Sequence, residues 1–175
     1  MPVEIERKFL VLSDEWRRAA TGSQRLRDGM LARFGDGKVR VRIADDQAWL
    51  TVKGPRIGLR RLEFEYQVAY SEAEEMLRTL CPEPLIEKTR YFVPYGGFTW
   101  EVDVYEGALE GLILTEIELE HEDQAFTMPE WVGPEVTDDP GYKMANLFKL
   151  HADPQSLLRK KAALAKGNLP TRSIQ

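Results

Sequence analysis

Rows of like-charged side chains recur along this chain at a spacing of two residues. Glu4 and Glu6 form the first row, and Arg40 and Arg42 form a later one. In a β-strand, side chains at positions i and i+2 lie on the same face, so each row places equal charges side by side. Paired carboxylates suit divalent cations, and clustered Arg and Lys suit phosphate oxygens. The rows therefore predict chemistry on a phosphate compound with a metal ion.

Charged residues alternate with apolar residues in seven segments, and six of these carry such a row. The acidic rows are Glu4 with Glu6, Glu63 with Glu65, Glu101 with Asp103, and Glu116 with Glu118; the basic ones are Arg40 with Arg42 and Lys88 with Arg90. Lys8 shares the face of Glu4 and Glu6, and Lys53 stands alone in the seventh segment. For any one strand, a solvated face is the ordinary interpretation. Mixed signs are expected on such a face, because like charges on neighbouring positions are unfavourable. Together, the rows favour counter-charges supplied from outside the chain.

The same alternation predicts about eight strands, the usual number for a small closed barrel. They are expected at residues 3–11, 30–34, 39–43, 48–53, 62–68, 88–93, 98–105 and 112–120. Helical segments are expected at 14–20 behind Ser13, at 72–78 behind a capping-box pattern begun by Ser71, at 142–150 and at 154–166. If the charged faces looked outward, the apolar faces would fill the barrel and leave the helices nothing to cover. We therefore predict an α+β fold, an antiparallel barrel with a charged interior and helices packed on its outside.

Length and composition narrow the class of protein. The 175 residues fit one domain, and a net charge of −5 does not suggest a nucleic-acid binder. With Cys81 as the only cysteine and two histidines, a disulfide, a thiolate cluster and a His-rich zinc site are not expected, which leaves a hard metal held by carboxylates. The first residues lack a signal-peptide pattern and no apolar run approaches the ~20 residues of a membrane span, so we expect a cytoplasmic protein without a membrane partner.

The segment Glu4-Ile5-Glu6-Arg7-Lys8 reads E-x-E-x-K and resembles the signature of the CYTH superfamily, the triphosphate tunnel metalloenzymes. This group includes inorganic triphosphatases, thiamine triphosphatases and class IV adenylyl cyclases. The later rows follow in the family's order, so that the resemblance covers residues 3 to about 150. It implies a single tunnel domain over residues 1–175, with eight antiparallel strands and triphosphate bound at the centre.

The resemblance also implies roles for individual residues. One or two Mg²⁺ or Mn²⁺ ions would be held by Glu4, Glu6, Glu116 and Glu118. Catalytic roles, as metal ligands, orienters of water or groups close to the anion, would fall to Lys8, Glu63, Glu65 and Asp103. Phosphate oxygens would be bound by Lys8, Arg40, Arg42, Lys53, Lys88, Arg90 and Lys143. Met30 stands where relatives often carry a Tyr, so no role of that Tyr is transferred.

Three functions compete. Hydrolysis of inorganic triphosphate, with nucleoside triphosphates as further substrates, leads because no Walker A sequence or nucleophilic Ser or Cys pattern is present and direct attack by water is simplest. A class IV cyclase is less favoured, since the family's His-Phe pair does not precede Glu4. A non-catalytic module for polyphosphate or nucleotide would not need so many carboxylates. The preferred metal, the physiological substrate and a homodimer are left open.

Overall fold

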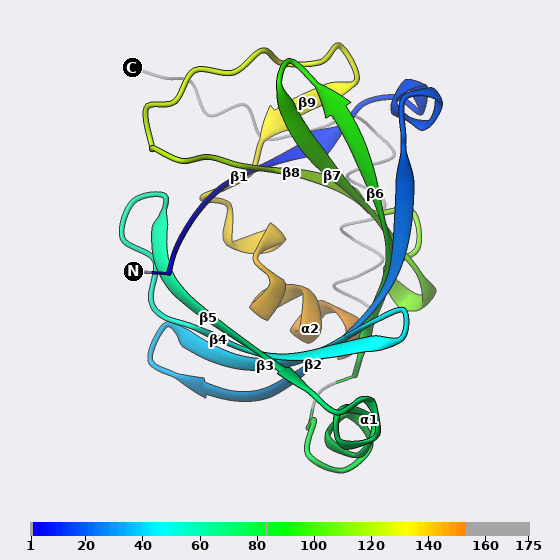
Figure 1. Cartoon of the computed structure of the whole chain (residues 1–175), viewed down its shortest axis with the longest axis vertical. Coiled ribbons are helices and arrows are strands. Elements are labelled where there is room, and N and C mark those ends of the chain that lie inside the picture. Colours follow the sequence, from blue (N-terminus) through cyan, green and yellow to red (C-terminus); the bar gives the residue numbers. More distant parts are fainter. Residues whose placement is uncertain (1, 83, 153–175) are drawn as a thin grey trace.

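The computed structural model describes residues 2–82 and 84–152, and its centre is a closed antiparallel β-barrel (Figure 1). Around the ring the strand order is β1-β5-β4-β3-β2-β6-β7-β8, and β8 pairs with β1 again. The eight strands are β1 (Val3–Val11), β2 (Gly22–Phe34), β3 (Gly37–Ala44), β4 (Gln47–Lys53), β5 (Arg60–Val68), β6 (Ile86–Tyr95), β7 (Phe98–Tyr105) and β8 (Ile113–Glu118). The predicted eight-stranded barrel is thus confirmed.

Apolar residues on the outer wall pack under short helices. The helix α1 (Tyr70–Thr79) covers β2, β3 and β4, where Ala73 and Leu77 join a buried cluster with Val41 and Ile43. Cys81 is partly buried against the same cluster, as a small apolar residue. On another part of the wall, the 3-10 helix η1 (Glu15–Arg18) inserts Trp16, which is fully buried. The apolar strand faces therefore look outward, as the inside-out barrel requires.

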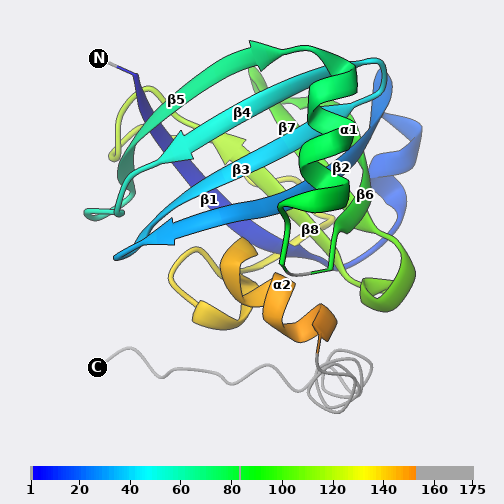
Figure 2. The ribbon, with the colours of Figure 1, turned by 90° about the horizontal axis from the view of Figure 1, so that it is seen from below.

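The helix α2 (Met144–Ala152) lies across one end of the barrel rather than along its wall, as Figures 1 and 2 show together. At this end the inward-facing rows change from charged to apolar: Lys8 is followed by Leu10, and Glu116 is preceded by Leu114. Leu147 and Phe148 of α2 are fully buried in one cluster with these leucines. This hydrophobic cluster closes part of this end of the barrel and borders the charged interior. No described helix is long and apolar enough to span a membrane.

Several predicted boundaries were wrong. The strand expected at 30–34 is β2, which begins at Gly22 because β3 and β6 pair with it on its two edges. A strand that the sequence did not predict, β9 (Val132–Glu135), adds to β1 outside the ring, at an edge position where Pro134 is tolerated. The strand expected to reach 120 is β8, which ends at Glu118.

The starts of the first two helices also differ from those predicted. Asp14 precedes η1 in place of the predicted Ser13, and α1 begins one residue before Ser71 with Ala69 at its N-cap. Neither helix has a side-chain cap, so the predicted capping box does not form. The 3-10 turns η2 (Gly107–Leu109) and η3 (Pro140–Tyr142) were not predicted, and η3 takes the start of the segment expected at 142–150. The helix expected at 154–166 lies outside the described residues.

Candidate active site

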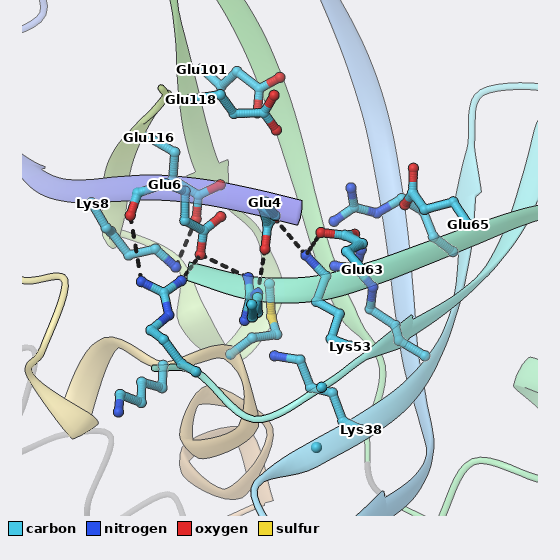
Figure 3. Close-up of a pocket in the computed structure, with 18 of the residues that line it drawn as sticks. Glu4, Glu6, Lys8, Lys38, Lys53, Glu63, Glu65, Glu101, Glu116 and Glu118 are labelled. Atoms are coloured by element: carbon cyan, nitrogen blue, oxygen red, sulfur yellow. Dashed lines mark hydrogen bonds and ion pairs between the residues drawn. The ribbon is translucent and has the colours of Figure 1, made fainter. Parts of the chain in front are cut away.

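The charged rows converge inside the barrel. They line a cavity of about 1090 Å³, which is shown from within in Figure 3. The predicted site residues that line it are Glu4, Glu6, Lys8, Arg40, Arg42, Lys53, Glu63, Glu65, Lys88, Arg90, Glu116, Glu118 and Lys143. Asp103 is the exception: its side chain is buried in the wall. Residues spread from 4 to 143 along the sequence therefore line one cavity.

The cavity carries a surplus of positive charge in a chain that is negative overall. Twelve of the lining residues are Lys or Arg and eight are Asp or Glu, whereas the chain has a net charge of −5. Concentrated positive charge with low-dielectric walls attracts anions and raises their local concentration. The surplus indicates a polyanionic ligand.

Carboxylates of neighbouring strands collect on one side of the cavity. Strand register places Glu6 opposite Glu118 and Glu101 opposite Glu116. Partial burial, followed by the neighbouring carboxylates of Glu101, Glu4 and Glu6, raises the pKa of Glu118 to about 7. A divalent cation would relieve this repulsion, and an all-oxygen donor set suits a hard ion. The donor chemistry therefore fits a divalent metal held by these strands.

Most of these carboxylates are engaged by cations of the chain itself. Glu4 accepts from Lys53 at 2.8 Å and also pairs with Arg61, which donates to Glu6 at 2.8 Å. Glu116 pairs with Lys8 at 2.7 Å and with Arg90 at 2.9 Å. Within the described ranges, no three Asp, Glu, His or Cys side chains converge as metal ligands. The rows thus neutralise one another across the cavity, where the sequence had suggested counter-charges from outside alone.

Two cations on β3 carry side-chain donors that have no partner among the described residues. Lys38 makes no side-chain hydrogen bond or ion pair with any described residue, and in Figure 3 it lies across the cavity from Glu101 and Glu118. Burial and the neighbouring cations Arg61, Lys53 and Arg40 lower the pKa of Lys38 well below its usual range. Arg40 is 4% exposed. Its Nη1 atom lies 3.5 Å from Asp28 Oδ1, but its Nε atom is buried without a partner. Unmet donors on crowded cations mark the place where an anion would be most strongly stabilised.

Two buried acids, Asp28 and Asp103, pair with the arginines of the cavity. Asp28 accepts from Arg42 at 2.8 and 3.1 Å, and these charges keep the pKa of Asp28 well below its usual range although burial alone would raise it. Asp103 accepts from Arg90 at 2.7 and 2.8 Å and also pairs with Lys88. Burial lowers the pKa of Lys88 to about 8, and Asp103 opposes that effect. The paired oxygens fix the guanidinium planes that face the cavity.

Several charged residues of the site were not predicted from the sequence. Lys38 and Arg61 extend the predicted rows by one step of two residues, so the signal was present. Asp28 precedes Gly29, a pair that resembles a turn rather than the inside of a strand. Arg56 lies in the β4–β5 loop, where no periodicity applies.

A closed antiparallel barrel with a charged interior is the scaffold of a tunnel-type enzyme. Similarity to known proteins shows the family to which this chain belongs. Residues 2–149 match the CYTH domain, so this chain belongs to the CYTH family. The chain is 47% identical over 149 residues to the inorganic triphosphatase of Acetivibrio thermocellus, covering 85% of this chain and 95% of that protein. It is 39% identical over 145 residues to the inorganic triphosphatase of Nitrosomonas europaea, covering 80% and 93%.

A solved structure supports the same family. The crystal structure of the inorganic triphosphatase NE1496 matches with a TM-score of 0.59 and 34% identity, over 82% of this chain and 93% of that one. Membership of this family of tunnel metalloenzymes implies a divalent metal cofactor. Among the described residues, the acidic side of the cavity offers carboxylate donors that fit such an ion.

Proposed function

We propose that this chain is a metal-dependent triphosphatase that hydrolyses inorganic triphosphate inside its barrel. The observation that carries the proposal is the cavity itself, where Lys38 and the Nε atom of Arg40 lack a partner among the described residues and share one lining with a group of carboxylates. A polyanion bridged to a divalent cation would satisfy both sides at once. The similarity to two inorganic triphosphatases, at 47% and 39% identity, supports triphosphate as the substrate.

We assign the metal, Mg²⁺ or Mn²⁺, to four carboxylates, those of Glu4, Glu6, Glu116 and Glu118. When bound, such an ion supplies charge neutralisation on the phosphate oxygens and an acidified water ligand. Arg40, Arg42, Lys53, Lys88, Arg90 and Lys143, with Lys8, bind the triphosphate oxygens. Arginine does so as a planar fork and lysine as a point charge. This division uses both sides of the cavity.

The remaining acids serve the attacking water and the geometry. Glu63 and Glu65 line the cavity and are assigned to orient the water for in-line attack on a terminal phosphorus. Thr51 donates to Glu65 at 3.1 Å, which restricts that carboxylate. Asp103 does not reach the cavity, so we assign it to position Lys88 and Arg90 rather than to touch the substrate. Phosphoryl transfer needs this positioning and charge stabilisation more than covalent chemistry.

The alternatives make different products. A class IV cyclase would convert ATP into cyclic AMP and pyrophosphate, and a binding module would release nothing. Nucleoside triphosphates remain a proposed secondary substrate class, and the cytoplasmic location and homodimer stay predictions.

Purified protein incubated with triphosphate or ATP and either Mg²⁺ or Mn²⁺ separates these functions. We expect one orthophosphate and one pyrophosphate per triphosphate, and no release after chelation with EDTA. Cyclic AMP from ATP without turnover of triphosphate would replace the hydrolase with a cyclase. Tight binding without any product would leave a binding module.

A further inference from the structure

Arg56 reaches into the cavity from the loop that joins β4 and β5. Its Nη2 atom donates to Glu6 Oε1 at 2.6 Å, and its Nη1 atom lies 3.4 Å from the backbone oxygen of Glu6. The Arg56 side chain is 17% exposed, and that of Glu6 is 10% exposed. Glu6 is the only carboxylate with which Arg56 pairs among the described residues. A loop arginine thus depends on a single partner, which is also a proposed metal ligand.

The tip of this loop is pinned from outside the barrel. Leu59 donates its backbone N–H to Glu122 Oε1 at 2.9 Å. Gly58 has a φ of +63°, and a Cβ atom there would lie 2.8 Å from the same carboxylate oxygen. Ile57 and Arg60 close the turn with two backbone hydrogen bonds, of 2.8 and 3.1 Å. The pinned turn keeps the start of the loop, and with it Arg56, over the cavity.

Metal binding would force a change of partners at Glu6. Its Oε1 atom accepts from both Arg56 and Arg61. Arg61 divides its pairing between Glu4 and Glu6, which are both proposed ligands, whereas among the described residues Arg56 pairs with Glu6 alone. A guanidinium does not lose its proton at any ordinary pH, so a displaced Arg56 keeps its charge and can bind another anion.

We propose that Arg56 is an exchangeable clamp: it neutralises Glu6 before the metal binds and transfers to a phosphate oxygen of the substrate once the cation takes Glu6. This inference rests on the proposed triphosphatase function and adds a substrate-binding residue outside the charged strand rows. It has two consequences of opposite sign. Arg56 competes with the metal for Glu6, so its loss tightens metal binding. Arg56 also helps to hold the substrate once metal is present, so its loss weakens substrate binding.

The variant Arg56→Gln tests both consequences, with Arg60→Gln as a matched control. Arg60 lies in the same loop region, is 56% exposed, and its nearest carboxylate is Glu122 at 3.9 Å. Titration calorimetry with Mn²⁺ alone should show about 3- to 10-fold tighter binding to Arg56→Gln, as expected for removal of a competing charge-assisted contact. At saturating Mn²⁺, the KM for triphosphate should rise about 10-fold, while kcat changes less. Arg60→Gln should change each quantity less than about 2-fold.

Weaker Mn²⁺ binding by Arg56→Gln, or an unchanged KM, would overturn the clamp. Arg56→Lys keeps the charge but not the two-point geometry, so its KM should fall between those of wild type and Arg56→Gln; a KM equal to that of Arg56→Gln would contradict a role in phosphate binding. A wild-type protein without turnover would refute the proposed function itself. The Mn²⁺ titration would still decide whether Arg56 competes for Glu6.

Discussion

Glu6 and Glu118 are direct partners across β1 and β8, so that two carboxylates stand opposite each other on the cavity face. Like charges in this arrangement destabilise a strand pair. Arg56 and Arg61 both pair with Glu6 and so offset part of the repulsion between the two carboxylates. Glu118 makes no such pair with any described residue, and its pKa is raised to about 7. The barrel thus keeps an unfavourable pair whose natural relief is a cation.

Replacing Glu118 should therefore stabilise the metal-free protein in a pH-dependent way. Because the pKa of Glu118 is raised from 4.5 to about 7 on folding, the folded state holds a proton that the unfolded state releases between these values. Stability from this group is present at acid pH and is lost as the pH rises toward 7. In EDTA, Glu118→Gln should melt about 1–3 °C above wild type at pH 8 and at the wild-type temperature near pH 4. A gain that is equal at both pH values would contradict the shift.

Removing one carboxylate from the acidic side of the cavity should sharply reduce turnover without unfolding the barrel. Glu4→Gln should lower the metal-dependent rate of phosphate release about 100-fold or more, because one proposed metal ligand is lost. Circular dichroism and a thermal melt should still report a folded protein. Glu72→Gln, on an exposed turn of α1, is the control and should retain full activity. Wild-type rates in Glu4→Gln would remove Glu4 from the site.

Lys38 should lower the folding stability of the ligand-free protein and strengthen the binding of triphosphate. Its lowered pKa means that the charged form is disfavoured by folding, so stability from this group rises with pH until the ordinary Lys value of 10.5 is passed. Lys38→Met should raise the melting temperature at pH 7, with a smaller gain at pH 10. The same change should weaken triphosphate binding about 10-fold, because a charge-assisted contact is lost. Lower stability together with unchanged binding would show that Lys38 serves the fold alone.

Asp103 should stabilise the fold and hold Lys88 and Arg90 in position. Asp103→Asn leaves Lys88 and Arg90 buried beside a neutral amide, and breaking a buried charge pair in this way destabilises by about 3 kcal/mol. Denaturant unfolding measures that loss. Because Asp103 is assigned to position the two bases, the KM for triphosphate should rise in the folded variant at low temperature. Unchanged stability would contradict the buried contacts.

The contact between α1 and the barrel depends on a glycine. A Cβ atom at Gly29 of β2 would lie 2.4 Å from Cys81 Sγ and 2.5 Å from Leu77 Cδ2. Gly29→Ala should therefore destabilise the protein by about 1–3 kcal/mol through overpacking. Gly22→Ala is the control, because its nearest neighbour is a Phe92 ring carbon at 3.9 Å. Equal melting temperatures for both variants would show that α1 is free to shift.

The strand rows could be predicted from the sequence because a pleated strand repeats every two residues. Glu116 and Glu118 needed only their own spacing to be placed on one face. The inside-out orientation followed from the apolar faces, and Val41 and Ile43 do face α1 on the outer wall. What local pattern could not supply was the partner of each charge: Asp28 and Arg42 meet only because β2 and β3 pair in that register.

The parts that were missed depend on tertiary context. The first half of β2 contains Gly22, Ser23 and Asp28 and has little strand propensity, but it is paired on both edges. The position of α2 depends on a ring of apolar side chains at strand ends, including Leu10 and Leu114, which no single segment reveals. Arg56 enters the site through loop geometry, for which the sequence offers no periodic signal.

The most direct test of the central claim is a crystal structure with Mn²⁺ and an imido-bridged triphosphate analogue that resists hydrolysis. We expect an anomalous manganese peak inside the barrel among Glu4, Glu6, Glu116 and Glu118. The phosphoryl groups should extend from it toward Lys38 and Arg40. Manganese and phosphate on the outer wall, or a charged cavity that holds neither at saturating concentrations, would contradict the account.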